Sequence, residues 1–478
     1  MLLAIPNASA GKQRGGGVQS ALPAWWRSMM KCARSDCAAE MSSCDGVPQC
    51  QTQLSCNERC SVSKTRRYSQ CVASECELGS KEHGELKTCV VAKCVDAAHK
   101  PVNKSAVVLA TSVTLLPPSF VAALTPAVGT PPPFYIYQGA AFDMNAALGC
   151  AHWWREDDQS AEVAMLRQLE IHPARVHAAT SAQLFVVPAL PYISYAAGTC
   201  KGSTHDERMR QLAKALHAEP TFQRRGGRDH VLVSNTFRFA AFRALKSLLA
   251  NATVGWFEQP TAAPASSTLH SLARKTWRCT VVVPYLANPH CGGGGAPSSS
   301  VGSGAPRAAG SVFFQGSWAA AANVRSHFKE LQGIEGVDVR DVPRGVGAAG
   351  VDSSKAGTAR AMAAHDLCLV PKGDTPSSGR LFSAMACGCL PLLISARLLA
   401  HLPYRRAARY EEWLHAINEE AFKDSPRAVL ETVIAKIGPN ASLYRERMRR
   451  AAAELLYNEP GSNVATNLLL EWKQSCSG

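Results

Sequence analysis

Two basic residues, Lys372 and Arg380, flank a short run that is rich in helix-capping side chains. Ser, Thr and Asp cap helices because their oxygens accept hydrogen bonds from the free N–H groups of the first turn. Such N–H groups and the positive end of a helix dipole bind phosphate, and nearby cations strengthen the site. We therefore expect a nucleotide diphosphate here. The residues expected to hold it are Lys372, Gly373, Asp374, Thr375, Ser377, Ser378 and Arg380.

The sequence on either side predicts the elements that position this run. Residues Leu367 to Val370 form a short apolar stretch, typical of a strand, which a proline and Gly373 end. Apolar residues then recur at helical spacing from Leu381, and Gly388 supplies a left-handed stop. Residues Leu390 to Ile394 are apolar enough for a fully buried strand. The pattern predicts a strand, a polar loop, a short helix and a second strand.

A second candidate for chemistry is Arg228-Asp229-His230, which follows two glycines at the start of a probable strand. A hydroxyl that attacks a carbon atom must lose its proton, and a histidine or carboxylate removes it near neutral pH. Asp229 and His230 are therefore the predicted catalytic residues. The alternative is a structural Arg–Asp pair beside a histidine in the core.

The sequence lacks the common motifs of metal, P-loop and serine-hydrolase sites. The sequence contains no H-E-x-x-H, Walker A or G-x-S-x-G pattern and no clear D-x-D. Residues Arg344 to Gly350 contain G-x-G-x-x-G, but Pro343 precedes them and helical spacing starts only near Thr358, so we interpret them as a loop. Residues Glu156 to Asp158 are interpreted as the acidic start of a helix rather than a cation site. We expect no metal site and no cofactor.

Composition limits the compartment and the partners. The net charge is +14, but basic residues are scattered and no basic block alternates with aromatics, so we expect no nucleic-acid partner. Ten of the 18 cysteines lie between Cys32 and Cys94, three pairs of them with C-x4-C spacing. Zinc is a competing explanation, but few histidines are near, which favours a disulfide-bonded helical module in an oxidising compartment. Four Asn-x-Ser/Thr sequons, at Asn7, Asn103, Asn251 and Asn440, agree.

The chain divides into six segments by composition. Residues 1–30 are a leader of unclear role, 31–100 the Cys-rich module, 101–133 a Pro-rich linker or stem, and 289–310 a Gly/Ser-rich linker. Strand and helix patterns alternate through 134–288 and 311–478, which predicts two Rossmann-like α/β domains facing a cleft. No clear signal peptide or membrane span is visible, although an interrupted apolar run at 105–142 is an alternative anchor.

Several stretches resemble the exostosin family of glycosyltransferases. Residues 367–391 match its signature, which reads approximately F-C-L-x-P-x-G-D-T-P-S-S-x-R-L-F-D-A and continues into a G-C-[IV]-P strand. Further blocks occur in the family's order: PFYIY, SAQLFVVPALPY up to Tyr192, GGRDHVLV, TVVVPY, SVFFQGSW with Arg325, and Leu402-Pro403 with Trp413. The resemblance covers roughly the last two-thirds of the chain and does not include the Cys-rich module.

This resemblance implies a GT-B-like fold and an inverting transfer, without an essential metal, from a nucleotide-sugar, expected to be a UDP-sugar, to a glycan or glycoprotein. The second domain would hold the donor, and the first would bind the acceptor, with Arg228 and Tyr192 on the acceptor side. The implied location is the Golgi or secretory lumen, with a type II membrane anchor or, alternatively, secretion. The Cys-rich module would serve as a stalk or bind a protein partner.

Two positions depart from the family pattern. Ser383 stands where an acidic residue is usual, and by analogy that acid would contact the donor ribose. Lys372 replaces an arginine, which exchanges a forked donor for a point charge. These changes leave two alternatives open: a glycan-binding relative with weak or no activity, and a secreted interaction protein that acts through its Cys-rich module.

Overall fold

The computed structural model describes residues 34, 38–45, 47, 113–115, 129–260, 273, 277–291, 307–318, 324–343 and 351–477. Residues 1–105 and residues 106–478 form two separate compact units. In the first unit the structure describes one helix, α2 (Ala38–Asp45). The rest of the predicted Cys-rich module, the loop at 344–350 and most of the Gly/Ser-rich linker lie outside the described residues.

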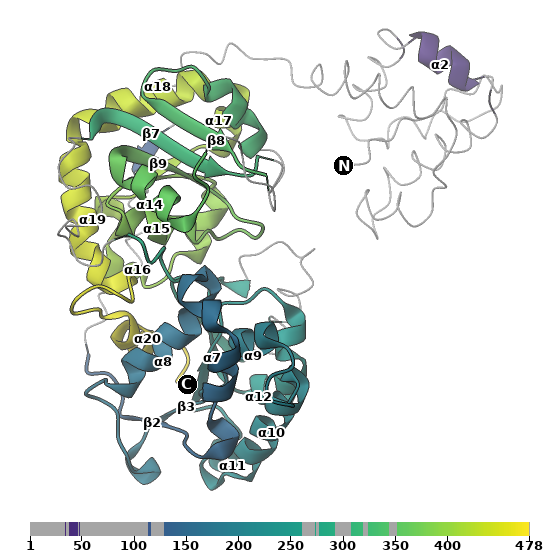
Figure 1. Ribbon diagram of the computed structural model, residues 1–478, viewed down its shortest axis with the longest axis vertical. Helices are drawn as coiled ribbons and strands as arrows, with labels where there is room; N and C mark the ends of the chain where they lie inside the picture. The colour runs from purple at the N-terminus through teal and green to yellow at the C-terminus, as the bar shows by residue number, and fades with distance from the viewer. Residues whose placement is uncertain are drawn as a thin grey trace, which may run out of the picture. The chain divides into compact units, whose positions relative to one another are not determined.

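The second unit contains two sheets (Figure 1). In the first sheet, the strand order is β2-β3-β4-β5-β6 and all neighbours are parallel. Its strands are β2 (Phe134–Ile136), β3 (Leu184–Val186), β4 (His230–Val233), β5 (Thr253–Trp256) and β6 (Cys279–Val282). The connections contain α7 (Asn145–Cys150), η4 (Asp158–Ser160), α8 (Ala161–Glu170), α9 (Pro191–Ala197), α10 (His205–Ala218), α11 (Pro220–Arg225) and α12 (Lys246–Leu249). Strands β3, β4 and β5 are buried along their whole length, as expected for a sheet covered on both faces.

The second sheet has six strands in the order β1-β11-β10-β9-β7-β8. They are β1 (Val113–Leu115), β7 (Ala308–Gly316), β8 (Val337–Asp341), β9 (His365–Pro371), β10 (Leu390–Ile394) and β11 (His415–Ile417). Only β1 is antiparallel to its neighbour. The helices are α14 (Lys355–Ala364), α15 (Arg380–Ala386), η9 (Ala396–His401), α16 (Arg405–Ala408), α17 (Glu419–Asp424), α18 (Pro426–Ile437) and α19 (Ala441–Leu455). The predicted architecture of two parallel α/β domains is confirmed.

Two segments cross between regions that composition had separated. Strand β1 comes from the predicted Pro-rich linker and pairs with β11 at the edge of the second sheet. The last helix, α20 (Val464–Ser475), packs against α8 beside the first sheet (Figure 1), and the Cys279–Cys476 disulfide joins it to β6. The chain therefore returns to the first sheet after completing the second.

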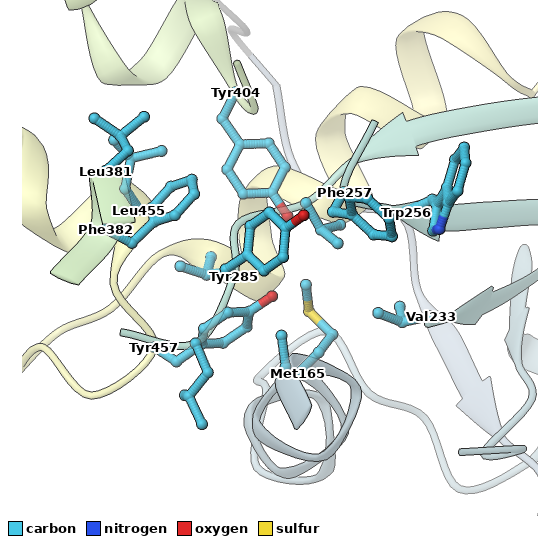
Figure 2. Packing of buried hydrophobic residues seen from close by; sticks show 14 of the residues in the cluster. Met165, Val233, Trp256, Phe257, Tyr285, Leu381, Phe382, Tyr404, Leu455 and Tyr457 are labelled. Atoms are coloured by element: carbon cyan, nitrogen blue, oxygen red, sulfur yellow. The ribbon is translucent and has the colours of Figure 1, made fainter. Parts of the chain in front are cut away.

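One apolar core continues from the first sheet to the second. Figure 2 shows Tyr285, which follows β6, surrounded by Phe257 from the end of β5 and by Tyr404 and Tyr457 from the second half of the chain. The hydroxyl of Tyr457 donates to the carbonyl of Pro284 at 3.1 Å. Because these contacts are buried, they fix the carboxyl ends of β5 and β6 against the second domain.

Candidate active site

The predicted phosphate loop lies at the carboxyl end of β9, and α15 begins at Arg380 as the spacing predicts. The N–H of Gly373 donates to the carbonyl of Ser377 at 2.8 Å, which closes the loop. A Cβ atom on Gly373 would come within 2.7 Å of that carbonyl oxygen, so this turn requires glycine. Helix α15 ends at Ala386, and Gly388, whose φ is 69°, follows it as the predicted left-handed stop. Ligands of open α/β sheets bind at this edge, outside the carboxyl ends of the strands.

Two arginines meet beside this loop on the ring of Phe314. The guanidinium carbon of Arg380 lies 4.5 Å from the ring centroid and that of Arg325 lies 5.8 Å from it. Arg380 donates to the carbonyl of Gln315 at 2.5 Å, and Arg325 donates to that of Lys372 at 2.9 Å. Burial, helped by repulsion from Arg325, lowers the pKa of the Arg380 guanidinium to about 9. Both residues are half-buried, and an anion bound between their like charges would relieve the repulsion.

Ser377 faces the first domain. Its N–H and its hydroxyl donate to one carboxylate oxygen of Glu258, at 2.8 Å and 2.6 Å. Its hydroxyl oxygen also lies 2.8 Å from that of Tyr285, whose pKa is raised by burial and by Glu258. Glu258 follows β5 and is fully buried. Ser377 therefore joins the loop to the first domain.

Asp158 and His401 make two more contacts between the domains. The carboxylate of Asp158 packs on Gly379, where a Cβ atom would lie 2.6 Å from Oδ2. Burial, with repulsion from Asp157, raises the pKa of Asp158 to about 6, although Lys355 opposes the shift. The N–H of Gln259 donates to Nδ1 of His401 at 2.9 Å.

The other predicted loop residues lie around this contact. Ser378 is buried, and Lys372, Gly373 and Thr375 are partly exposed. Asp374 is exposed.

Ser383 makes a contact of another kind. Its hydroxyl accepts the N–H of Asn288 at 3.1 Å, in the segment that leaves the first domain. The Cys291–Cys387 disulfide holds the same segment against the end of α15, and Cys368–Cys389 joins β9 to the start of β10. The structure thus places Ser383 beside the connection between the domains.

Asp229 and His230 lie at the amino end of β4, inside the core. The His230 ring stacks on Phe185 at 5.0 Å, its Nδ1 lies 2.9 Å from Asp229 and its Nε2 lies 2.7 Å from the Tyr137 hydroxyl. Burial lowers the pKa of His230. Asp229 is paired with Arg224 at 3.2 Å. Because both ring nitrogens are bonded and the ring has no exposed surface, these contacts fit the structural alternative.

The predicted acceptor-side residues Arg228 and Tyr192 lie apart. Arg228 is exposed in the turn before β4, next to the buried Asp229. Tyr192 is buried in the first turn of α9 and donates its hydroxyl to Asp157 at 2.7 Å. Its N–H donates to the buried carboxylate of Glu162, as does that of Ile193. Glu162 therefore binds the start of α9.

Glu162 gives the fold a pH dependence. Burial raises its pKa to about 8, so the folded chain keeps this proton from about pH 5 to about pH 8 while the unfolded chain loses it. Stability from this group is therefore present below its ordinary pKa and declines as pH rises toward 8. We expect Glu162→Gln to remove this decline, so that the melting temperature of the variant relative to wild type rises across that range. Glu170→Gln, at an exposed position of α8, is the matched control. A pH-independent difference between wild type and Glu162→Gln would contradict this.

Within the described ranges, no group of three or more His, Cys, Asp or Glu side chains is arranged to hold a metal ion. Among the helices that the structure describes, none has the length and apolar character needed to cross a bilayer.

Four disulfides in the described part of the chain, including Cys150–Cys200, indicate that the protein folds in an oxidising compartment. The two sequons within that part, Asn251 and Asn440, are exposed.

Comparison with known proteins agrees with the geometry. No curated protein matches the chain. The model of the exostosin GT47 domain matches residues 117–433, which include every strand of the two sheets except β1, and the loop before α15. A parallel α/β pair of domains with a basic loop at its carboxyl edge is the arrangement that the resemblance implied. The chain therefore belongs to the exostosin family 47 of glycosyltransferases.

Proposed function

We propose that this protein transfers a sugar, with inversion, from a UDP-sugar to a hydroxyl group of a glycan or glycoprotein in the Golgi lumen. The observation that supports this most is the half-buried pair Arg325 and Arg380, which share the ring of Phe314 at the phosphate loop. A diphosphate placed there relieves the repulsion between the two guanidinium groups. Lys372 adds a third positive charge at the same loop.

In this reaction the acceptor oxygen attacks the anomeric carbon, the bond from that carbon to the diphosphate breaks, and UDP leaves. The cations stabilise the charge that develops on the diphosphate, which is the part of such a reaction that a metal ion serves in other enzymes. The proposal includes no metal. Ser378 and Thr375 have hydroxyl groups at the same loop, whereas the N–H and hydroxyl of Ser377 are bonded to Glu258.

The proton of the attacking hydroxyl needs an acceptor, and we assign this role to Asp158 instead of Asp229 or His230. Asp158 belongs to the first domain and packs on Gly379, at the start of α15. Its raised pKa, about 6, suits a base that works near neutral pH. Asp229 and His230 lie at the opposite, amino end of the sheet.

A panel of UDP-sugars tests this function. The full-length protein is purified under oxidising conditions and incubated with each donor, with and without neutral oligosaccharide acceptors, and UDP release is measured. We expect release with one donor or a few, increased by an acceptor. No release with any donor, together with retained glycan binding, would favour the non-catalytic alternative. We further propose a membrane anchor, and a protein partner that binds residues 31–100.

A stability measurement separates the two roles considered for His230. His230→Ala removes a stacked, doubly bonded ring from the core, so we expect a loss of about 2–3 kcal/mol in unfolding free energy. The folded fraction should keep its rate of UDP release. His177→Ala, at an exposed position, is the control. Loss of turnover with an unchanged melting temperature would restore His230 as the base.

A further inference from the structure

A cavity of about 710 Å³ opens at the carboxyl end of β2. Its walls come from the segment after β2, the segment after β3, and helices α7 and α8. It runs along β2 from Arg175, which bridges to Phe134 at the amino end of the strand, to Leu190 beyond the carboxyl end. That second end lies at the same edge of the first sheet as Glu258 and Tyr285, since β2 to β6 are all parallel.

The lining combines apolar and polar groups. Leu148, Leu166 and Leu190 supply apolar surface, and Gln138 lies exposed at the rim. The charged lining residues balance in number, with two bases and two acids: Arg167, Arg175, Asp143 and Glu170. A ligand suited to this cavity is therefore neutral, with hydroxyl groups and apolar C–H faces, which is the chemistry of a pyranose sugar.

The backbone at the cavity wall is strained. Leu190 is a buried residue with a φ of 42°, in the left-handed region that leucine avoids. Such conformations persist where the surrounding structure holds them, and they cluster at ligand sites. Leu190 directly precedes Pro191, the first residue of α9, so the strain fixes the entry of that helix beside the cavity.

Helix α8 connects the cavity to the proposed base. Asp158 stands just before α8, and Val163, Leu166, Arg167 and Glu170 line the cavity at helical spacing along one face. From Asp158 to Arg167 the chain advances about 13 Å at about 1.5 Å per residue. Across the sheet, β2 and β5 are three strand spacings apart, or about 14 Å. One extended pyranose unit is about as long as one strand spacing, so about three units span the distance from β5 to β2.

We propose that this cavity is a distal subsite for a neutral acceptor oligosaccharide of about three or more units. The inference rests on the proposed function, because it needs the terminal acceptor hydroxyl at Asp158. The cavity holds the units behind the reacting one, so the protein prefers a chain over a single sugar.

Kinetics with acceptors of graded length test the subsite. The probes are cello-, xylo-, manno- and galacto-oligosaccharides of one to five units, with the donor that gives UDP release. We expect KM to fall by about tenfold once the chain reaches the cavity. Leu166→Trp fills the cavity and should remove that gain, while leaving turnover of short acceptors and donor hydrolysis without acceptor unchanged. Equal KM for short and long acceptors in the wild type would overturn the proposal.

Controls separate this inference from folding and from the proposed function. Ile171→Trp changes an exposed residue just after α8 and should have no effect. If Leu166→Trp lowers the melting temperature, Gln138→Trp blocks the cavity from its exposed rim. If no donor is turned over, the proposed function fails, and saturation-transfer NMR with the same oligosaccharides then decides: binding by wild type that Leu166→Trp loses supports the subsite, and no binding by wild type excludes it.

Discussion

Replacing Arg380 by alanine should lower kcat/KM for UDP release by about 10²–10³-fold, as expected when a preorganised charge is removed from a developing anion. Arg380 is half-buried beside Arg325 with its guanidinium on Phe314, and Gly316 leaves room for it, since a Cβ atom there would lie 3.0 Å from Nη2. The same variant should bind UDP more weakly in calorimetry. Arg380→Lys should recover only part of the loss, because an ammonium group cannot reproduce the forked donor.

The fold should tolerate this change. The pKa of Arg380 is lowered because its charge is desolvated and repelled by Arg325. Removing this charge therefore removes an unfavourable interaction from the protein when no anion is bound. We therefore expect a melting temperature close to that of wild type. Arg450→Ala, at an exposed arginine of α19 that pairs with Glu446, is the matched control and should keep full activity. Full turnover by Arg380→Ala would place the diphosphate elsewhere.

The loop before α15 was predictable because its signals are local. A buried strand, a proline, capping residues, helical spacing and a final glycine follow one another within about thirty residues, and each has its own physical cause. The residues of the first domain that contact this loop have no such local signal. Asp158 and Glu258 reach the loop from positions more than 100 residues earlier in the chain, and only the packing of two domains brings them there. Asp157 does begin a helical turn, as its acidic sequence predicts, by accepting the N–H of Gln159.

Glycine was the least informative residue for prediction. The sequence does not mark β5 clearly as a strand, because Gly255 interrupts a short apolar run and glycine weakens isolated strands. In the structure a Cβ atom at Gly255 would lie 2.9 Å from the Val233 side chain, so glycine permits close packing on β4. Before Asp229, the second glycine, Gly227, has a φ of 89° and packs on the ring of Phe222. That pair of glycines serves a turn, although its sequence suggested a site.

Replacing Asp158 by asparagine should lower the rate of sugar transfer by about 10²–10⁴-fold, the usual effect of losing a general base. Asparagine keeps the shape of the side chain, and the backbone carbonyl of residue 158 can still accept the N–H of Leu286. The donor-binding cations are unchanged, so the affinity for UDP should be preserved. This combination distinguishes Asp158→Asn from Arg380→Ala, which should lose both.

The pH profile identifies the base independently of the size of that loss. A base acts only when it is ionised, so wild-type kcat/KM, which reports the free enzyme, should fall as pH drops through about 6, the raised pKa of Asp158. This fall is the acidic limb of the pH profile. Burial and Asp157 favour the protonated form of Asp158, whereas Lys355 and Arg380 favour its carboxylate. Lys355→Ala should therefore raise the pKa of Asp158 and move the acidic limb to higher pH. Asp158→Asn should abolish the limb. Glu258→Gln keeps an acceptor for Ser377 and should retain it, so disappearance of the limb in Glu258→Gln alone would transfer the role of base to Glu258.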